Sequence, residues 1–131
     1  MKGNKMNTPA DRANRAAWQH FSLYSIFIML FIGILANLGT ISLIVFAGEK
    51  VYLPITILII FINILSAAGT VDAIGDFDAV RLDYDDKEKE TSLAKRFSNT
   101  PTLFFKILLT ILFIWTGIAQ LYVMYLSYKK S

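Results

Sequence analysis

The sequence has no cysteine and a single histidine, His20. The absence of cysteine excludes disulfide bonds, thiolate zinc sites and iron–sulfur clusters. The one histidine has no second histidine or cysteine beside which it could hold a metal ion. We therefore expect no cofactor and no metal centre built on these residue types.

Polar residues are also scarce. Hydrophobic residues make up 55% of the 131 residues, and the mean hydropathy is +0.51. A soluble fold needs polar residues on the outer face of every element, and this chain has too few of them. The formal net charge of +3 is small, and we expect no nucleic-acid partner.

Three segments are long and apolar enough to cross a bilayer, which takes about 18–20 residues. They cover residues 21–47, 51–71 and 102–128. In lipid, each backbone N–H and C=O must be paired within its own segment, so all three are predicted to be helices. Pro54 and Pro101 stand at the starts of the second and third helices, where a missing N–H costs little. The sequence thus predicts an all-α integral membrane protein with three transmembrane helices, forming one domain over residues 1–131.

The distribution of Lys and Arg predicts the orientation. The tail of residues 1–20 has four of them and residues 72–101 have five, whereas the opposite side has three. Because cytoplasmic loops carry an excess of Lys and Arg, the N-terminus and residues 72–101 are predicted to be cytoplasmic and the C-terminus outside. The expected location is a cell membrane, the inner or plasma membrane.

The predicted cytoplasmic loop, residues 72–101, begins with a block of six aspartates. These are Asp72, Asp76, Asp78, Asp83, Asp85 and Asp86. The block lacks the third ligand and the glycine of an EF-hand calcium loop, and a weak divalent-cation site stays an alternative. The favoured interpretation is a recognition or self-docking surface that contacts the net-positive N-terminal tail on the same membrane face.

The beginning of this loop has helical periodicity. Val71, Ile74, Phe77 and Tyr84 recur at spacings that favour continuation of the second helix beyond the membrane. A second short helix is predicted to begin near Ser92.

Each predicted span carries a stripe of small and polar residues at coiled-coil spacing, which is typical of membrane helix interfaces. The candidate interface residues are Gly33, Asn37, Thr40, Thr56, Asn63, Thr70, Thr116, Gly117 and Gln120. Counted at about 1.5 Å per residue, Asn37 and Asn63 lie at one depth and can hydrogen-bond each other. Two interpretations are open: contacts within one three-helix bundle, or a polar contact to a partner helix or a hydrophilic path.

A boundary ion pair is also predicted. Asp72 lies twenty-one residues inward from Val51, and Lys106 lies twenty inward from Leu126. Both side chains therefore reach the cytoplasmic boundary at one level. The alternative is that each extends to water independently.

Two families share features with the chain. "RAAW" at 15–18 and "NILSAAGTVDAIGD" at 63–76 resemble the prokaryotic diacylglycerol kinases, which also have three spans. The chemistry of that family uses glutamates on the second span, where this chain has Asn63 and Thr70, so the resemblance does not imply kinase activity. "AKRFSNTP" at 94–101 and the terminal "YKKS" resemble immunity proteins against pore-forming colicins, which share the predicted topology. Phage holins have the same gross plan.

Paired carboxylates of the aspartate block could do acid–base work, but nothing near them supplies a pocket or a nucleophile. We therefore expect a non-catalytic multi-pass membrane protein. Its expected role is lateral helix–helix contact, as an accessory subunit of a membrane complex. Its expected partners are the bilayer and other membrane subunits or copies of itself. An immunity or exclusion protein and a holin-like pore former are the alternatives.

Overall fold

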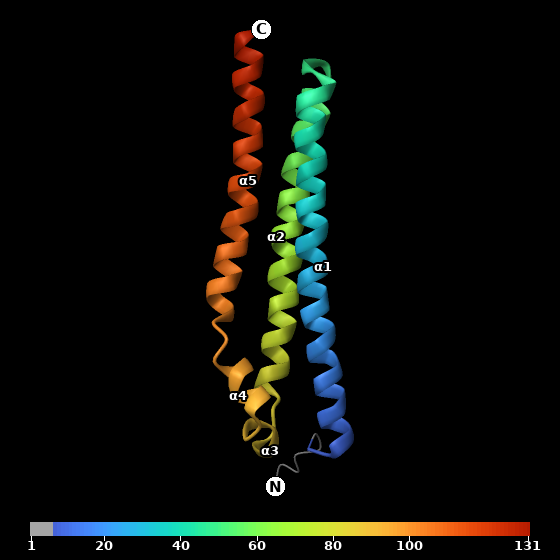
Figure 1. Cartoon of the computed structure of the whole chain (residues 1–131), viewed down its shortest axis with the longest axis vertical. Coiled ribbons are helices and arrows are strands. Elements are labelled where there is room, and N and C mark those ends of the chain that lie inside the picture. The colour runs from blue at the N-terminus through green and yellow to red at the C-terminus, as the bar shows by residue number, and fades with distance from the viewer. Residues whose placement is uncertain (1–6) are drawn as a thin grey trace.

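The computed structural model describes residues 7–131, which form only helices and their connections. The elements follow in the order α1 (Pro9–Ala47), η1 (Glu49–Val51), α2 (Tyr52–Leu82), α3 (Asp86–Lys89), α4 (Ser92–Ser98) and α5 (Thr102–Lys130). The three long helices run side by side, and α3 and α4 lie together at one end (Figure 1). The predicted all-α class is confirmed over these residues.

All three long helices are long and apolar enough to span a membrane. They correspond to the three predicted spans and mark the chain as a membrane protein.

Helix α1 extends far beyond one bilayer. Its 39 residues span about 60 Å, roughly twice the thickness of a hydrocarbon core. Pro9 stands in the first turn, and Thr8 and Asp11 form a reciprocal capping box that fixes the start. The predicted tail is therefore helical from Pro9 onwards. Lys2 and Lys5 lie outside the described residues.

A tight turn joins α1 to α2. Gly48 has φ of 74°, a region that side chains with a Cβ rarely adopt, and η1 follows directly. The two helices therefore pack antiparallel as a hairpin.

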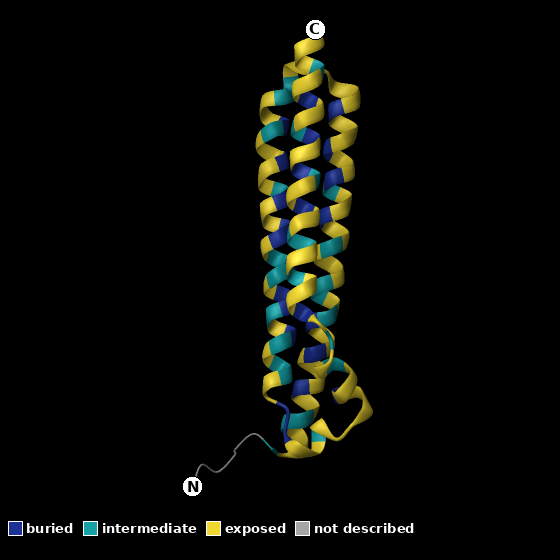
Figure 2. Cartoon of the chain, turned by 90° about the vertical axis from the view of Figure 1, so that its left-hand side faces the viewer, coloured by how far each residue is buried: buried dark blue, intermediate teal, exposed yellow. Residues whose placement is uncertain are grey.

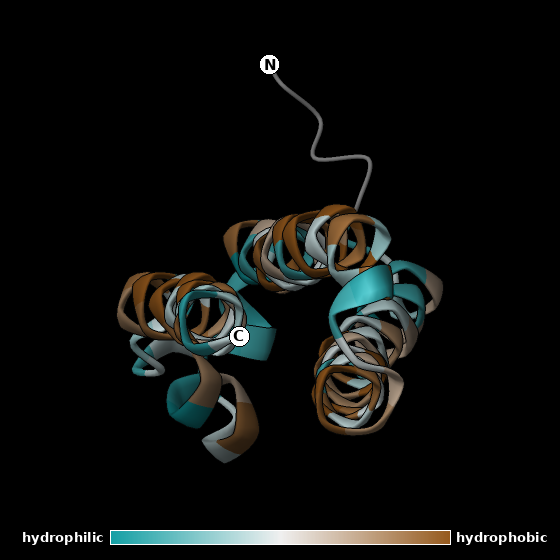
Figure 3. Cartoon of the chain, turned by 90° about the horizontal axis from the view of Figure 1, so that it is seen from above, coloured by the Kyte–Doolittle hydropathy of each residue, from teal (hydrophilic) through white to brown (hydrophobic). Residues whose placement is uncertain are grey.

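Helix α2 packs along both α1 and α5, whereas α1 and α5 touch each other only at a few points. Seen from above, the three long helices stand at three corners (Figure 3). Helix α2 is therefore the element that holds the bundle together.

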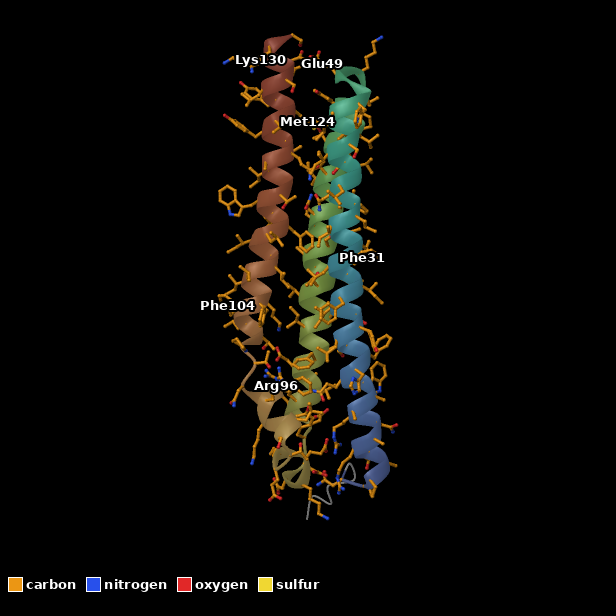
Figure 4. The ribbon with its side chains drawn as sticks, in the orientation of Figure 1. Phe31, Glu49, Arg96, Phe104, Met124 and Lys130 are labelled. Atoms are coloured by element: carbon orange, nitrogen blue, oxygen red, sulfur yellow. The ribbon has the colours of Figure 1, made fainter. Side chains whose placement is uncertain are left out.

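The interior of the bundle contains polar and small residues together with a few large apolar ones, and most of the large apolar residues face outward. A buried strip follows the inner face of each long helix (Figure 2). Phe31 on α1 and Phe104 on α5 project outward and are 64% and 58% exposed, whereas Met124 points inward (Figure 4). Near the α1–α2 turn, Met124 packs with Ile44, Ile55 and Ile59 in a small apolar core. In lipid, this arrangement leaves apolar side chains against the acyl chains.

Helix α2 continues past the predicted span to Leu82. Ala73, Ile74 and Phe77 are buried there, so apolar contacts continue along the helix after Asp72. A short helix begins at Ser92, as predicted, with the Thr91 side chain accepting from the Ala94 N–H. We call residues 9–20 of α1, residues 72–82 of α2, and the segment from Asp83 to Thr100 the charged end.

Candidate functional site

Four polar side chains from the three long helices meet inside the bundle. Asn37 and Thr40 come from α1, Asn63 from α2 and Gln120 from α5, and none is more than 6% exposed. Asn37 Oδ1 accepts from Asn63 Nδ2 at 3.1 Å and from Gln120 Nε2 at 2.6 Å. Thr40 Oγ1 donates to Gln120 Oε1 at 2.5 Å. We call these four residues the amide cluster.

Two glycines allow close approach of the helices beside this cluster. A Cβ on Gly33 would lie 2.6 Å from Phe113 Cε1 and 2.9 Å from Ser66 Oγ. A Cβ on Gly117 would lie 3.2 Å from Asn63 Nδ2. The predicted interface residues Gly33 and Gly117 thus lie where an added side chain would crowd a neighbouring helix.

The remaining predicted interface residues do not join the cluster. Thr56 and Thr116 donate to the carbonyls of Tyr52 and Leu112, each within its own helix. Thr70 is fully buried, and its hydroxyl has no hydrogen-bond partner among the described residues. Asn63 Oδ1 is likewise buried without a partner. The cluster contains only neutral amides and a hydroxyl, so it orients helices and offers no nucleophile.

Asp78 is the centre of a second polar group, where α2 meets the start of α5. Its carboxylate lies 3.3 Å from Lys106 Nζ, accepts from Thr102 Oγ1 at 2.7 Å and also pairs with Arg81. Arg81 Nη1 donates to the carbonyls of Phe97 at 2.7 Å and Thr100 at 3.2 Å. These bonds hold the connection between α4 and α5 against α2.

The predicted ion pair between Asp72 and Lys106 is not formed, because Lys106 pairs with Asp78 instead. Asp72 is exposed, while the adjacent Ala73 and Ile74 are buried. The prediction compared only the depths of Asp72 and Lys106 along their helices. It did not specify the face of α2 on which Asp72 or Asp78 lies.

A third group ties α1 to the segment that contains α3. Arg12 Nε donates to Asp85 Oδ2 at 2.6 Å, and Arg15 Nε donates to Glu88 Oε1 at 2.9 Å. Arg15 also lies 3.7 Å from Asp85. Asp85 and Glu88 form the capping box of α3 as well. We call these four residues the clasp.

The clasp is largely shielded from water. The side chains of Arg15 and Asp85 are 9% and 4% exposed. The hydrogen bond from Arg12 holds the pKa of Asp85 below its ordinary value, with a further contribution from the Glu88 N–H. The predicted contact between the basic tail and the acidic block is therefore made by Asp85, with Glu88 added.

The other aspartates of the block face outward. Asp72, Asp76, Asp83 and Asp86 are exposed, and among residues 7–131 only Asp86 of these four forms an ion pair, with Lys89 at 3.8 Å. Within residues 7–131, no group of three or more His, Cys, Asp or Glu residues is arranged to hold a metal ion.

Two further features escaped the sequence predictions. Gln19 is buried beside the clasp, and its Oε1 accepts from the Tyr84 hydroxyl. Trp115 is 64% exposed in the middle of α5. Helical spacing places Trp115 outside the polar stripe of its helix, and this could be read from the sequence. The spacing does not show whether lipid or another protein covers Trp115.

Comparisons of the chain with models of protein families, with curated proteins and with solved structures find no match.

Proposed function

We propose that this chain is a multi-pass membrane protein without catalytic activity that acts by lateral helix–helix contact as an accessory subunit of a membrane protein complex. The residues of the amide cluster bond one another within the bundle, so the proposed contact uses the outer apolar surface. The observation that carries this proposal is the position of Trp115.

Trp115 lies thirteen residues after Thr102 and fifteen before Lys130, about 20 Å from each end of α5. Tryptophan is enriched at the two membrane interfaces, where its N–H can reach water or headgroups. In hydrocarbon, an indole N–H without an acceptor is costly. Trp115 is 64% exposed, and its N–H has no acceptor among the described residues.

The surroundings of Trp115 complete a surface of the expected kind. Ile111, Ile118 and Tyr122 are exposed at helical spacings from it, at 46%, 48% and 60%. A rigid aromatic residue framed by branched apolar side chains is a frequent centre of binding energy at protein interfaces. The proposed partner is therefore a transmembrane helix that offers a carbonyl or hydroxyl oxygen near the middle of the bilayer.

The orientation and the membrane belong to the same proposal. The charged end would face the cytoplasm and the α1–α2 turn the outside, with the chain in the inner or plasma membrane. The excess of Lys and Arg at the charged end supports this arrangement.

The test is Trp115→Leu in the full chain, extracted gently at native expression, with mass spectrometry of the co-purified membrane proteins. We expect the variant to insert normally and to lose its partner by about tenfold or more, because a central tryptophan contributes roughly 2 kcal/mol or more. The matched control is Phe61→Leu, which replaces a 61% exposed aromatic on α2.

Equal recovery of the partner with Trp115→Leu and with the unchanged chain would contradict the proposal. A lone monomer from the unchanged chain would contradict the subunit role and favour the alternative of an immunity or exclusion protein, whose partner arrives as a toxin. The pore-forming alternative requires large homo-oligomers and leakage on overexpression. A pore of this kind would also need polar side chains on the outer surface of the bundle, where copies of the chain would line the channel. The amide cluster instead faces the inside of the bundle.

A further inference from the structure

A cavity of about 180 Å³ opens at the charged end, between α1, the start of α3 and α4. Arg12 and Gln19 line it from α1, and Tyr84 and Glu88 line it from the segment after α2. Leu93 and Ala94 of α4 supply an apolar wall. This cavity is separate from the span surface around Trp115.

A buried donor without a partner lines this cavity. Gln19 is 5% exposed, and its Nε2 has no hydrogen-bond partner among the described residues. Its Oε1 accepts from the Tyr84 hydroxyl, so Nε2 is the end of the amide that faces the cavity without a partner. Buried polar groups are almost always satisfied, so a free Nε2 beside a cavity indicates a missing acceptor.

The two charged residues of the cavity, Arg12 and Glu88, each have a side-chain atom without a hydrogen-bond partner among the described residues. Arg12 bonds Asp85 through Nε and the Asn7 carbonyl through Nη2, which leaves Nη1 without a partner in residues 7–131. Glu88 accepts its bonds at Oε1, which leaves Oε2. Two donors and one anionic acceptor therefore remain at one cavity, with no net charge between Arg12 and Glu88.

We propose that this cavity binds a small zwitterion of α-amino-acid type. The ligand carboxylate would accept from Gln19 Nε2 and Arg12, and its ammonium would donate to Glu88. A short aliphatic side chain would lie against Leu93 and Ala94. An apolar cavity of about 150 Å³ holds benzene, with six non-hydrogen atoms, so 180 Å³ suits about six to eight such atoms, the size of alanine or valine.

The experiment uses the full chain in lipid nanodiscs, with L-alanine and L-valine as probes. The readouts are the dissociation constant from titration and the hydrogen exchange of residues 84–96. Isovalerate, which is valine without the ammonium group, and isobutylamine, which is valine without the carboxylate, are the matched ligands. We expect valine to bind and to slow exchange, and each analogue to bind about tenfold or more weakly, because each loses bonds to a charged group.

Gln19→Glu tests the free donor. It keeps the oxygen that accepts from Tyr84 but replaces Nε2 with a carboxylate oxygen, which would repel the ligand carboxylate. We expect at least about tenfold weaker valine binding and an unchanged affinity for Lys95→Gln, an exposed residue of α4 outside the cavity. Leu93→Trp, on the exposed rim, is expected to block entry without touching the buried amide.

Absence of binding by both amino acids would overturn the proposal, with water then the occupant. Equal binding of valine, isovalerate and isobutylamine would also overturn it, since the two charges would then play no part. Undiminished binding in both Gln19→Glu and Leu93→Trp would place the ligand elsewhere.

Discussion

Asn37 is the residue on which the intramembrane hydrogen bonds converge, because its Oδ1 accepts from both Asn63 and Gln120. Asn37→Leu removes both bonds and leaves the donor of Gln120 unpaired. We expect a loss of about 1–3 kcal/mol in the free energy of unfolding, since one such bond in a membrane contributes about 0.6–2 kcal/mol. Unfolding in mixed micelles, followed by circular dichroism, measures this change.

Thr116→Val is the matched control for that measurement. Thr116 is polar and lies on α5 near the same depth, but its hydroxyl bonds the Leu112 carbonyl of its own helix. We expect a change of less than about 0.5 kcal/mol, as for positions outside a shared network. Equal losses for the two variants would show that the amide cluster has no special role.

At the residue scale, the depth of a side chain in the membrane could be predicted from the sequence. The side of the helix on which it lies could not. The fixed rise of a helix placed Asn37 and Asn63 at one level, and they are hydrogen-bonded. The same counting paired Asp72 with Lys106 and failed, because Asp72 is on an exposed face of α2. The rotation of a helix depends on packing with its neighbours, which one sequence does not reveal.

At the element scale, the approach of α5 to the hairpin depends on Gly33. Gly33→Ala would place a Cβ 2.6 Å from the ring of Phe113, which is only 2% exposed and packed among other side chains. We expect destabilisation by about 1–3 kcal/mol, the range for overpacked sites. Gly39→Ala on the same helix meets nothing within 4 Å and should be neutral or stabilise by up to about 1 kcal/mol. Thermal unfolding of the two variants in one detergent separates these outcomes.

The segment that contains α3 and α4 depends on the clasp. Helix α3 has four residues, too few to form alone, and its capping carboxylates are the ones that Arg12 and Arg15 bind. Asp85→Asn is therefore expected to release the segment from α1 at neutral pH. Spin labels on Ala13→Cys and Lys95→Cys, both exposed sites, report the separation by pulsed electron resonance. Asp86→Asn, whose side chain is fully exposed, should leave the separation unchanged.

The clasp should also respond to acid. The folded pKa of Asp85 is lowered, chiefly by the hydrogen bond from Arg12, so the clasp stabilises the charged end fully above the unfolded value near 3.8. That contribution is lost as pH falls through the folded pKa. Because that pKa lies below the ordinary value, the same spin-label pair should stay together as pH falls to about 4 and separate only at more acidic pH. An Asp85→Asn variant that keeps the separation of the unchanged chain at neutral pH would show that Asp85 does not hold the segment.

The sequence predicted that the three long helices exist more accurately than it predicted the residues at which they begin and end. Long apolar runs require helices in lipid, and all three are present. The predicted continuation of the second helix beyond the membrane is confirmed as far as Leu82, because buried Ile74 and Phe77 continue the contacts of the span. The start of α1 at Pro9, twelve residues before the predicted span, was not predicted. Helix α3 was not predicted, since its stability comes from arginines more than seventy residues away.

For the whole molecule, the orientation is the prediction that a label can test. The chain has no cysteine, so Glu90→Cys and Ser131→Cys each introduce the only thiol. With the charged end in the cytoplasm, a membrane-impermeant maleimide should label Ser131→Cys in intact cells and Glu90→Cys only after permeabilisation. The reverse pattern would show the opposite orientation.

The central place of α2 has a consequence for how the chain is made. The α1–α2 contacts involve only residues up to Leu82, so this hairpin is complete before the ribosome has synthesised α5. Gly33, Asn37 and Ser66 then present a finished seam on which the last helix can dock. We expect assembly to follow the order of synthesis, with the α1–α2 hairpin forming first and α5 packing against it within the bilayer.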